Sequence, residues 1–243
     1  MVFSGSEDSV LIVIPAFNEV RNISPVIDEL KKTNSNFSIL VVDDGSTDGT
    51  YQAAQKMGVN VARLPFNLGV GAAMRLGFRY AEMHGYSKVI QLDADGQHVP
   101  SCIESLLEAL ESSDIVVGSR FAEGAVSFDV GRVRRFAMKV LAFSLSRLTK
   151  TKLTDVTSGF RASGPRAIQL FSTTYPPEYL GDTIESLVIA HRNGLSIGEI
   201  PTTIRARISG SSSQSSLRAL IYTIRAIAVL ALSILHRQPA SRL

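Results

Sequence analysis

The chain has 243 residues, of which 45% are hydrophobic and 19% charged, and these values are typical of a globular protein with a full core. Its single cysteine, Cys102, excludes an internal disulfide and fits a reducing compartment, and its four scattered histidines exclude a Cys/His zinc cluster. Residues 1–131 hold 9 basic and 17 acidic side chains, whereas the remainder hold 16 and 5, so the basic second half indicates an anionic partner. These basic residues are dispersed and carry no nucleic-acid-binding motif, which disfavours nucleic acid.

Strand and helix patterns alternate over the first 120 residues. Short apolar runs predict strands at Val10–Pro15, Phe37–Val42, Val59–Leu64, Lys88–Asp93 and Asp114–Gly118. Helical patterns lie between them at about Val20–Lys32, Thr47–Met57, Gly71–His84 and Pro100–Glu111. This alternation predicts βαβ units, and therefore an α/β fold with a mostly parallel sheet.

Polar clusters follow these strands at the ends where ligands bind in parallel sheets. They are Asn18-Glu19, Asp43-Asp44-Gly45-Ser46, Asn67-Leu68-Gly69, Asp93–Gln97 and Ser119-Arg120. Because the carboxyl ends of parallel strands share one edge of the sheet, the sequence predicts a single shared site there.

The pattern changes after Arg120. A loop is expected at 122–132, a basic helix at about Arg132–Leu148, another helix near Leu180–Asn193 and a strand near Ile197–Arg205. A Ser-rich linker follows at Gly210–Ser216.

The last segment, Leu217–Leu235, is apolar but contains Arg218 and Arg225, and its longest uncharged stretch is too short to span a bilayer. We expect an amphipathic helix that lies in a membrane interface or docks on a partner protein. A core or dimer helix is the alternative.

The run Asp93-Ala94-Asp95-Gly96-Gln97 places two carboxylates one residue apart at a strand end, where both side chains face the same way. Such a pair repels itself unless a cation neutralises it, and carboxylate oxygens together with substrate phosphate suit Mg²⁺ or Mn²⁺. A solvated turn is the alternative.

Four motifs in this order resemble family 2 glycosyltransferases of the GT-A fold, a three-layer α/β/α architecture. They are Pro15-Ala16-Phe17-Asn18-Glu19, Val42 to Thr50, Asn67 to Ala73 and Asp93 to His98. Three later motifs, Gly118 to Phe121, Ser158 to Arg161 and Glu199 to Pro201, are similar to the dolichol-phosphate mannose synthase branch. Ser213 stands where that branch commonly has Lys, and Met138 where it often has Ser.

The resemblance implies a nucleotide-diphosphate sugar donor, a GDP- or UDP-sugar, and a polyprenyl phosphate acceptor. Asp95 and Gln97 are the expected metal ligands, and Asp93 would contact donor ribose or metal-bound water, so these three are the expected catalytic residues. Donor-binding residues are expected at Pro15, Ala16, Phe17, Asn18, Glu19, Asp44, Asn67, Gly71, Asp93, Ala94, Asp95 and Arg207. Asp43 is expected to be structural, and Asp48 is expected to cap a helix.

Arg120, Arg134 and Arg161 are expected to bind the acceptor phosphate, because Arg recognises phosphate oxygens with paired hydrogen bonds. A lipid phosphate is already ionised near neutrality and needs no general base. Asp155, Asp182 and Glu185 are the carboxylates available if a base is needed, and none is assigned as one.

These observations predict an inverting, metal-dependent enzyme that makes a polyprenyl-phosphate sugar at the cytoplasmic face of the cell membrane, as a peripheral protein. The predicted glycosyltransferase domain covers 1–210, with a donor half at 9–120 and an acceptor half at 121–210, and 211–243 form the linker and amphipathic helix. The protein would work alone, as a homo-oligomer or with a membrane-protein partner. A glycosyltransferase acting on a glycan hydroxyl, and a non-catalytic nucleotide-sugar-binding subunit, are the alternatives.

Overall fold

The computed structural model describes residues 9–34, 36–122, 132–176 and 182–205. The expected linker, the apolar segment Leu217–Leu235 and Arg207 lie outside these residues. The described chain forms one seven-stranded sheet in the order β3-β2-β1-β4-β6-β5-β7. Its strands are β1 (Val10–Ala16), β2 (Ser38–Asp43), β3 (Asn60–Arg63), β4 (Lys88–Gln91), β5 (Ile115–Ser119), β6 (Arg161–Ser163) and β7 (Ile197–Pro201).

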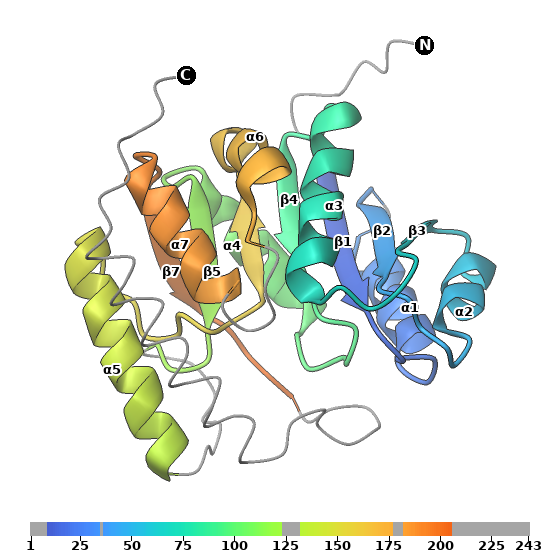
Figure 1. Ribbon diagram of the computed structural model, residues 1–243, viewed down its shortest axis with the longest axis horizontal. Coiled ribbons are helices and arrows are strands. Elements are labelled where there is room, and N and C mark those ends of the chain that lie inside the picture. Colours follow the sequence, from blue (N-terminus) through green and yellow to red (C-terminus); the bar gives the residue numbers. More distant parts are fainter. Residues whose placement is uncertain (1–8, 35, 123–131, 177–181, 206–243) are drawn as a thin grey trace.

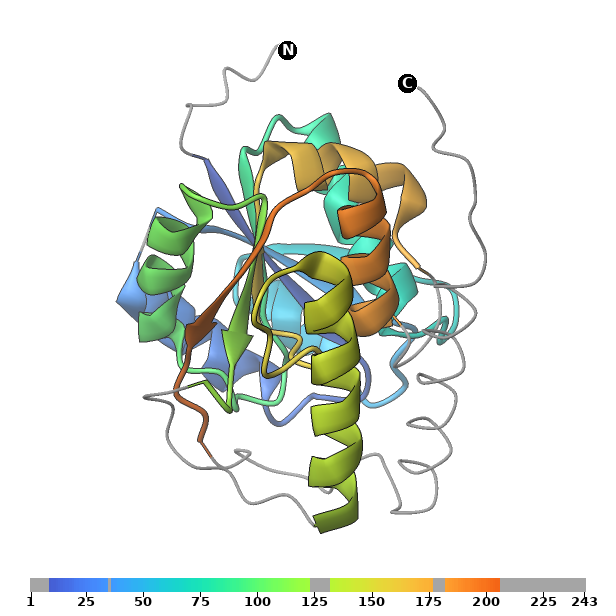
Figure 2. The same ribbon diagram turned by 90° about the vertical axis from the view of Figure 1, so that its left-hand side faces the viewer.

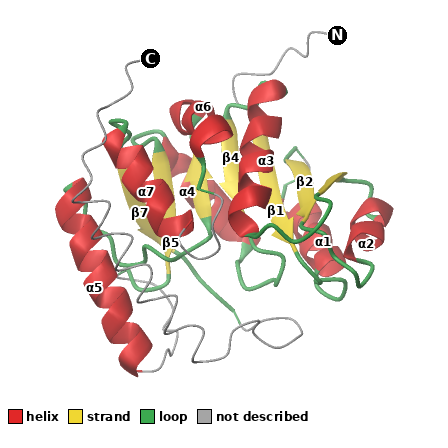
Figure 3. Ribbon diagram, viewed as in Figure 1, coloured by secondary structure: helices red, strands yellow, loops and turns green. Residues whose placement is uncertain are grey.

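Helices cover both faces of this sheet, so the architecture is the expected three-layer α/β/α sandwich (Figures 1 and 3). They are α1 (Ile23–Thr33), α2 (Thr50–Lys56), α3 (Val70–Met83), α4 (Ile103–Leu110), α5 (Arg132–Thr149), α6 (Pro165–Thr174) and α7 (Asp182–Arg192), with a 3₁₀ turn η1 (Pro100–Cys102) before α4. Viewed from the side, α5 stands at one end of the body next to α7 (Figure 2).

The strands contribute side chains to two separate hydrophobic cores, because successive side chains of a strand point to opposite faces of the sheet. In β1, Leu11 and Val13 pack with α3, α6 and α7, whereas Ile12 and Ile14 pack with α1 and α4. Helix α3 lies very close to the sheet, since a Cβ on Gly77 would come within 2.5 Å of the Val13 side chain. This close packing fixes the helix that follows the third loop of the site.

The pairing of strands is parallel except at β6, which runs antiparallel to both β4 and β5 within the described sheet. The sequence pattern gave no sign of β6 or of α6. Three residues are too few for a strand alternation to show, and α6 carries several Ser and Thr residues, which are weak helix formers. The last expected strand is also shorter than predicted, because β7 ends at Pro201 and only single contacts continue beyond it.

Candidate functional site

The loops after β1 and β2 are joined by hydrogen bonds at the carboxyl edge of the sheet. The N–H of Asp44 donates to the carbonyl of Ala16 (2.8 Å), and that of Asn18 to Ser46 Oγ (2.9 Å). The Asn18 side chain accepts from the N–H of Thr47 (3.0 Å) while its own φ of 56° lies in the left-handed region that Asn tolerates. The two motifs therefore form one structure, as the shared-site prediction requires.

Asp44 fixes the third loop, which leads into α3. Its two carboxylate oxygens accept from the N–H groups of Leu68 and Gly69, each at 2.8 Å, and the residue is only 4% exposed. Burial raises the pKa of Asp44, although these two hydrogen bonds oppose the rise. Gly45 is required beside it, because a Cβ would lie 2.6 Å from the Phe66 backbone. Asp44 thus has a structural role in addition to the donor contact expected of it.

Two further acidic residues have structural roles, although the N-cap of α2 is Gly49 and the expected capping residue Asp48 lies one position before it. Asp43 is fully buried, forms an ion pair with Arg63 (3.1 Å) and accepts from the N–H of Ser46 (3.3 Å). Asp48 accepts from the N–H of Thr50, the first residue of α2, at 3.0 Å. Asp48 therefore stabilises the start of that helix.

The other expected donor residues surround the same edge. Phe17 is 43% exposed, and the exposed Asn67 lies in the third loop. The side chain of Glu19 accepts from Asn22, while its backbone N–H donates to Thr50 Oγ1 (2.9 Å). Gly71 is buried in the first turn of α3. These residues line an open edge with both apolar and polar groups.

The segment after β4 presents its functional side chains on one side. β4 ends at Gln91, earlier than predicted, yet the alternation continues: Asp93, Asp95 and Gln97 are partly exposed, whereas the intervening Ala94, Gly96 and His98 are buried. The Asp95 carboxylate accepts from the N–H of Gln97 (3.0 Å), and Gly96 has a φ of 74°. The segment is therefore a compact turn that points two carboxylates and one amide outward.

His98 supports this turn from beneath. It is 8% exposed, its ring stacks on Phe160 at 4.8 Å between centroids, and its Nδ1 accepts from the N–H of Asp93 (3.2 Å). Gly159 lies against the same carboxylate, since a Cβ there would come within 3.0 Å of Asp93 Oδ1. These contacts fix Asp93 and give His98 a structural role.

Arg120 is held beside the site by Asp155. Its Nε and Nη2 donate to the two oxygens of Asp155 at 2.5 and 2.8 Å, and Nη2 also donates to Thr157 Oγ1 at 2.9 Å. Burial alone would raise the pKa of Asp155, but the hydrogen bonds and charge of Arg120 hold it below its ordinary value. Asp155 is therefore an ionised partner of Arg120, which makes it unsuitable as a general base.

Glu199 in β7 organises the loop that carries Asp155. Its carboxylate accepts from the N–H groups of Thr154 (2.7 Å) and Asp155 (3.0 Å) and from Thr154 Oγ1 (2.7 Å). This glutamate begins the motif Glu199 to Pro201, whose sequence does not indicate its role. The structure shows that it shapes the loop holding Arg120.

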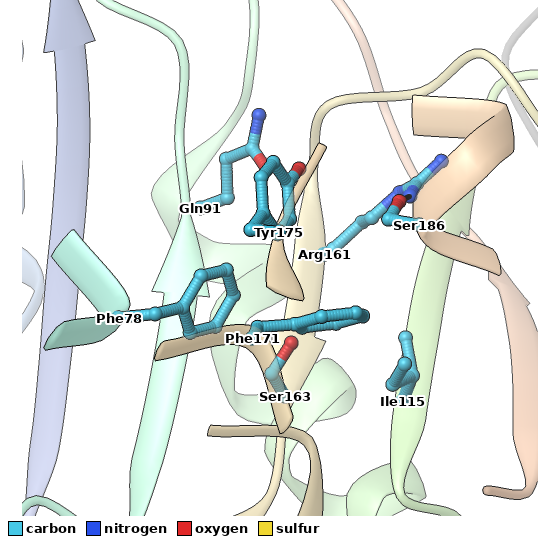
Figure 4. A pocket seen from close by; sticks show the side chains of 8 residues that line it. All are labelled: Phe78, Gln91, Ile115, Arg161, Ser163, Phe171, Tyr175 and Ser186. Carbon is cyan, nitrogen blue, oxygen red and sulfur yellow. Dashed lines mark hydrogen bonds between the residues drawn. The ribbon is translucent and has the colours of Figure 1, made fainter. Parts of the chain in front are cut away.

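Arg161 does not occupy the position expected of an acceptor-phosphate ligand. It is 5% exposed, and its guanidinium donates to the carbonyls of Val156, Ser158 and Thr183 and to Ser186 Oγ at 2.8–3.0 Å. Figure 4 shows it with Ser186 at an interior cavity of about 10 Å³, the room of roughly one water molecule. The error arose because the sequence does not reveal that β6 runs through the middle of the sheet and takes this side chain inside.

Asp182 is a second buried charge near Arg161. It is 1% exposed, and neither of its oxygens makes a well-formed hydrogen bond to a described residue, although nearby backbone N–H groups favour its ionised form. Burial raises the pKa of Asp182 to about 6, although the charge of Arg161 opposes the rise. Its burial leaves it poorly placed to take a proton from an acceptor.

The remaining basic candidates fall on α5 and beyond. Arg134 lies in the first turn of α5, whose side chains there are outside the described part, as is the whole of Arg207. Further along α5, Val140 is 37% and Phe143 is 65% exposed. In the part of the chain that the structure describes, no helix combines the length and apolarity needed to cross a membrane.

The donor set at the turn after β4 fits a hard divalent ion. Asp93, Asp95 and Gln97 offer only oxygen ligands on one exposed side, which Mg²⁺ and Mn²⁺ prefer. The described residues contain no group of three or more His, Cys, Asp or Glu side chains arranged to hold an ion. An ion at this turn would therefore take several of its ligands from a bound diphosphate and water.

Comparisons with known proteins agree with this geometry. Residues 11–169 match the family model described as glycosyl transferase family 2. The chain is 30% identical over 230 residues to the polyprenol monophosphomannose synthase of Mycolicibacterium smegmatis, covering 88% of this chain and 84% of that protein. It is 31% identical over 214 residues to the undecaprenyl-phosphate mannosyltransferase of Micrococcus luteus, covering 85% and 87%.

Among solved structures, glucosyl-3-phosphoglycerate synthase from Mycobacterium tuberculosis, in complex with Mn²⁺, UDP and glucosyl-3-phosphoglycerate, superposes with a TM-score of 0.72. The match covers 97% of this chain and 83% of that one at 20% identity. At this identity the likeness concerns the fold.

Proposed function

Because the chain belongs to glycosyltransferase family 2 and has the GT-A fold, we propose that it transfers a sugar from a nucleotide-diphosphate sugar to a polyprenyl phosphate. The observation that carries the proposal is the turn after β4. It presents Asp93, Asp95 and Gln97 together at the carboxyl edge of the sheet. Relatives named for transfer to polyprenyl phosphates align over more than four-fifths of this chain, which supports the acceptor class.

In the proposed reaction, a phosphate oxygen of the acceptor attacks the anomeric carbon from the face opposite the leaving group. The bond between that carbon and the donor diphosphate breaks, so the products are the polyprenyl phosphate sugar, with inverted configuration, and a nucleoside diphosphate. Mg²⁺ or Mn²⁺, when bound, would neutralise charge on the departing diphosphate. Asp95 and Gln97 would hold the ion, and Asp93 would orient the donor ribose or a water of the ion.

The nucleotide would lie along the first three loops. Pro15 to Glu19, Asn67 and Gly71 would line its pocket, Asp44 would hold the third loop in place, and Arg207 would contact the diphosphate. The second ionisation of a phosphomonoester has a pKa of about 6, so the acceptor is already nucleophilic near neutrality. This agrees with the positions of Asp155 and Asp182, neither of which is available as a base.

The acceptor phosphate would be recognised by Arg120 and by Arg134 of α5. Arg120 is oriented by Asp155, so its guanidinium is preorganised for a second anion. Arg161 is not part of this proposal, since its donors are already used inside the protein.

The protein would work at the membrane surface, where its acceptor resides, as a peripheral protein on the cytoplasmic side. Val140 and Phe143 are exposed on α5, and these two apolar side chains would contact the membrane surface. The apolar segment Leu217–Leu235, with its two arginines, would supply a further contact.

The test is transfer from a panel of GDP- and UDP-sugars to undecaprenyl or dolichyl phosphate by the full-length protein, with products resolved by mass. The free polyprenol serves as the matched acceptor control. Formation of a phosphate-linked sugar lipid, and none from the alcohol, is expected. Equal transfer to the alcohol, or transfer only to a glycan hydroxyl, would contradict the proposed acceptor.

A further inference from the structure

Four residues beyond β7 connect the two sides of the active-site edge. At one end, the N–H of Thr202 donates to the carbonyl of Ser119 (2.9 Å), next to Arg120. At the other end, Ile204 forms an isolated antiparallel bridge with His98, and the N–H of Arg205 donates to the carbonyl of Gln97 (3.1 Å). The segment therefore runs along the edge of the sheet from the arginine to the carboxylate turn (Figure 1).

The side chain of Arg205 adds a second contact to that turn. Its Nε donates to the carbonyl of Gly96 at 2.6 Å, so the backbone and side chain of one residue bind two consecutive carbonyls. These carbonyls belong to Gly96, which lies between the outward-facing Asp95 and Gln97, and to Gln97 itself. Gly96 has a φ of 74°, in the left-handed region that favours glycine.

The guanidinium is fixed from its other side by α1. Arg205 Nη1 donates to Glu29 Oε1 at 2.9 Å and its Nη2 donates to Glu29 Oε2, which makes a two-point pair across 176 positions of sequence. The side chain of Arg205 is 37% exposed and that of Glu29 is 33% exposed. An ion pair this exposed contributes little to the free energy of folding, so protein stability does not explain it. A positioning role explains the pair better: the Glu29 carboxylate orients the Arg205 guanidinium, which donates to the turn that carries Asp95 and Gln97.

We propose that Arg205 is a positioning residue for the donor site: its guanidinium, oriented by Glu29, holds the turn at Gly96 so that Asp95 and Gln97 keep the geometry needed for a metal-bound diphosphate. The assignment of that turn to the donor rests on the proposed function. Neither Arg205 nor Glu29 would touch the reacting atoms. Their effect passes through the backbone of the turn.

The experiment measures binding of UDP and of GDP to the full-length protein by calorimetry in Mn²⁺, with unfolding midpoints measured in parallel without ligand. Arg205→Met should weaken nucleotide binding by about 10-fold or more, the usual size for loss of a residue that supports metal ligands. Arg205→Lys should recover part of this affinity, since one ammonium donor reaches Gly96 without reproducing the fork.

Arg166 provides a matched control. It also pairs with a carboxylate, Asp114, and donates to a backbone carbonyl, that of Gly194 at 3.2 Å, but its contacts lie at the start of β5 and the end of α7. Arg166→Met should lower the unfolding midpoint by a similar amount and leave nucleotide affinity unchanged. If Arg205→Met behaves in the same way, Arg205 is only structural and the proposal is wrong.

Glu29→Gln separates positioning from direct attraction of the diphosphate. Removing a negative charge near a diphosphate site would tighten nucleotide binding if Arg205 acted through its charge, whereas loss of orientation would weaken it. Weaker binding supports the proposal, and unchanged or tighter binding overturns it, even if Arg205→Met fails to fold. No acceptor enters this measurement, so a failure of the polyprenyl phosphate assignment would leave it unaffected.

Discussion

Arg120 and Asp155 form a two-point ion pair in which the Asp155 side chain is fully buried and the Arg120 side chain is 17% exposed. Arg120→Ala should lower the free energy of unfolding by about 3–5 kcal/mol, because it leaves a buried carboxylate without its cation. Urea unfolding measures this loss. The double variant Arg120→Ala/Asp155→Asn should recover a large part of it, and no recovery would mean that the loss comes from packing.

Acceptor use should separate the two members of this pair. Asp155→Asn keeps the cation and loses part of its orientation, whereas Arg120→Ala removes the cation. Under conditions where both variants are folded, the KM for polyprenyl phosphate should therefore rise much more in the arginine variant than in Asp155→Asn. Nucleotide affinity should change little in either. Equal losses of acceptor affinity in both variants would show that Arg120 acts through local structure instead of binding phosphate.

The buried Asp182 predicts a pH dependence of stability. Its folded-state pKa of about 6 lies above its ordinary 3.8, so the folded protein binds this proton more tightly and loses stability as pH rises from about 4 to 6. Asp182→Asn removes the effect. The free energy of unfolding of the variant relative to wild type should therefore rise by up to about 3 kcal/mol across that window and stay level above it. A difference that is the same at pH 4.5 and pH 7 would contradict this prediction.

Metal dependence is the prediction most directly tied to Asp95. Chelation should abolish transfer and Mg²⁺ or Mn²⁺ should restore it, while Asp95→Ala should lower the rate by more than about 100-fold, since several kcal/mol of leaving-group stabilisation is lost. Steady-state kinetics in metal-buffered solution measure both effects. Full turnover by chelated protein would rule the metal out.

Gly159 offers a way to displace Asp93 without replacing it. A Cβ at this position would lie 3.0 and 3.1 Å from the two carboxylate oxygens and 3.2 Å from Gln91 Nε2. Gly159→Ala should therefore lower the transfer rate by about 10-fold, since small misplacements of positioned groups are costly. Gly164→Ala is the control, because the nearest atom to its Cβ would be 3.5 Å away. Equal activity in both variants would mean that the Asp93 side chain moves aside without consequence.

The donor half of the fold was predictable because each of its strands and helices carries a clear period. The positions of Asp43, Asp48 and the Asp93–Gln97 turn followed from strand ends and helix starts, which are local in sequence. Arg161 was misjudged for the opposite reason. Its environment comes from Val156, Ser158, Thr183 and Ser186, and only the tertiary structure brings these groups around it.

Long-range contacts of this kind also hid Glu199 and Arg205. Glu199 acts on residues 44 and 45 positions earlier, and Arg205 pairs with a helix near the start of the chain. No spacing in the sequence encodes such pairs. Their roles therefore became visible only with coordinates.

The position of β6 bears on how such enzymes can be recombined. Residues 161–163 lie between β4 and β5 and pair with both, so the portion of chain that follows Arg120 supplies a central strand to the sheet built by the portion before it. A fragment that stops at Arg120 would leave β5 without its neighbours on either side. Chimaeras that exchange acceptor specificity between relatives must therefore match the register of β6 to the recipient sheet, because a join placed at the apparent boundary between the halves would divide a single folding unit.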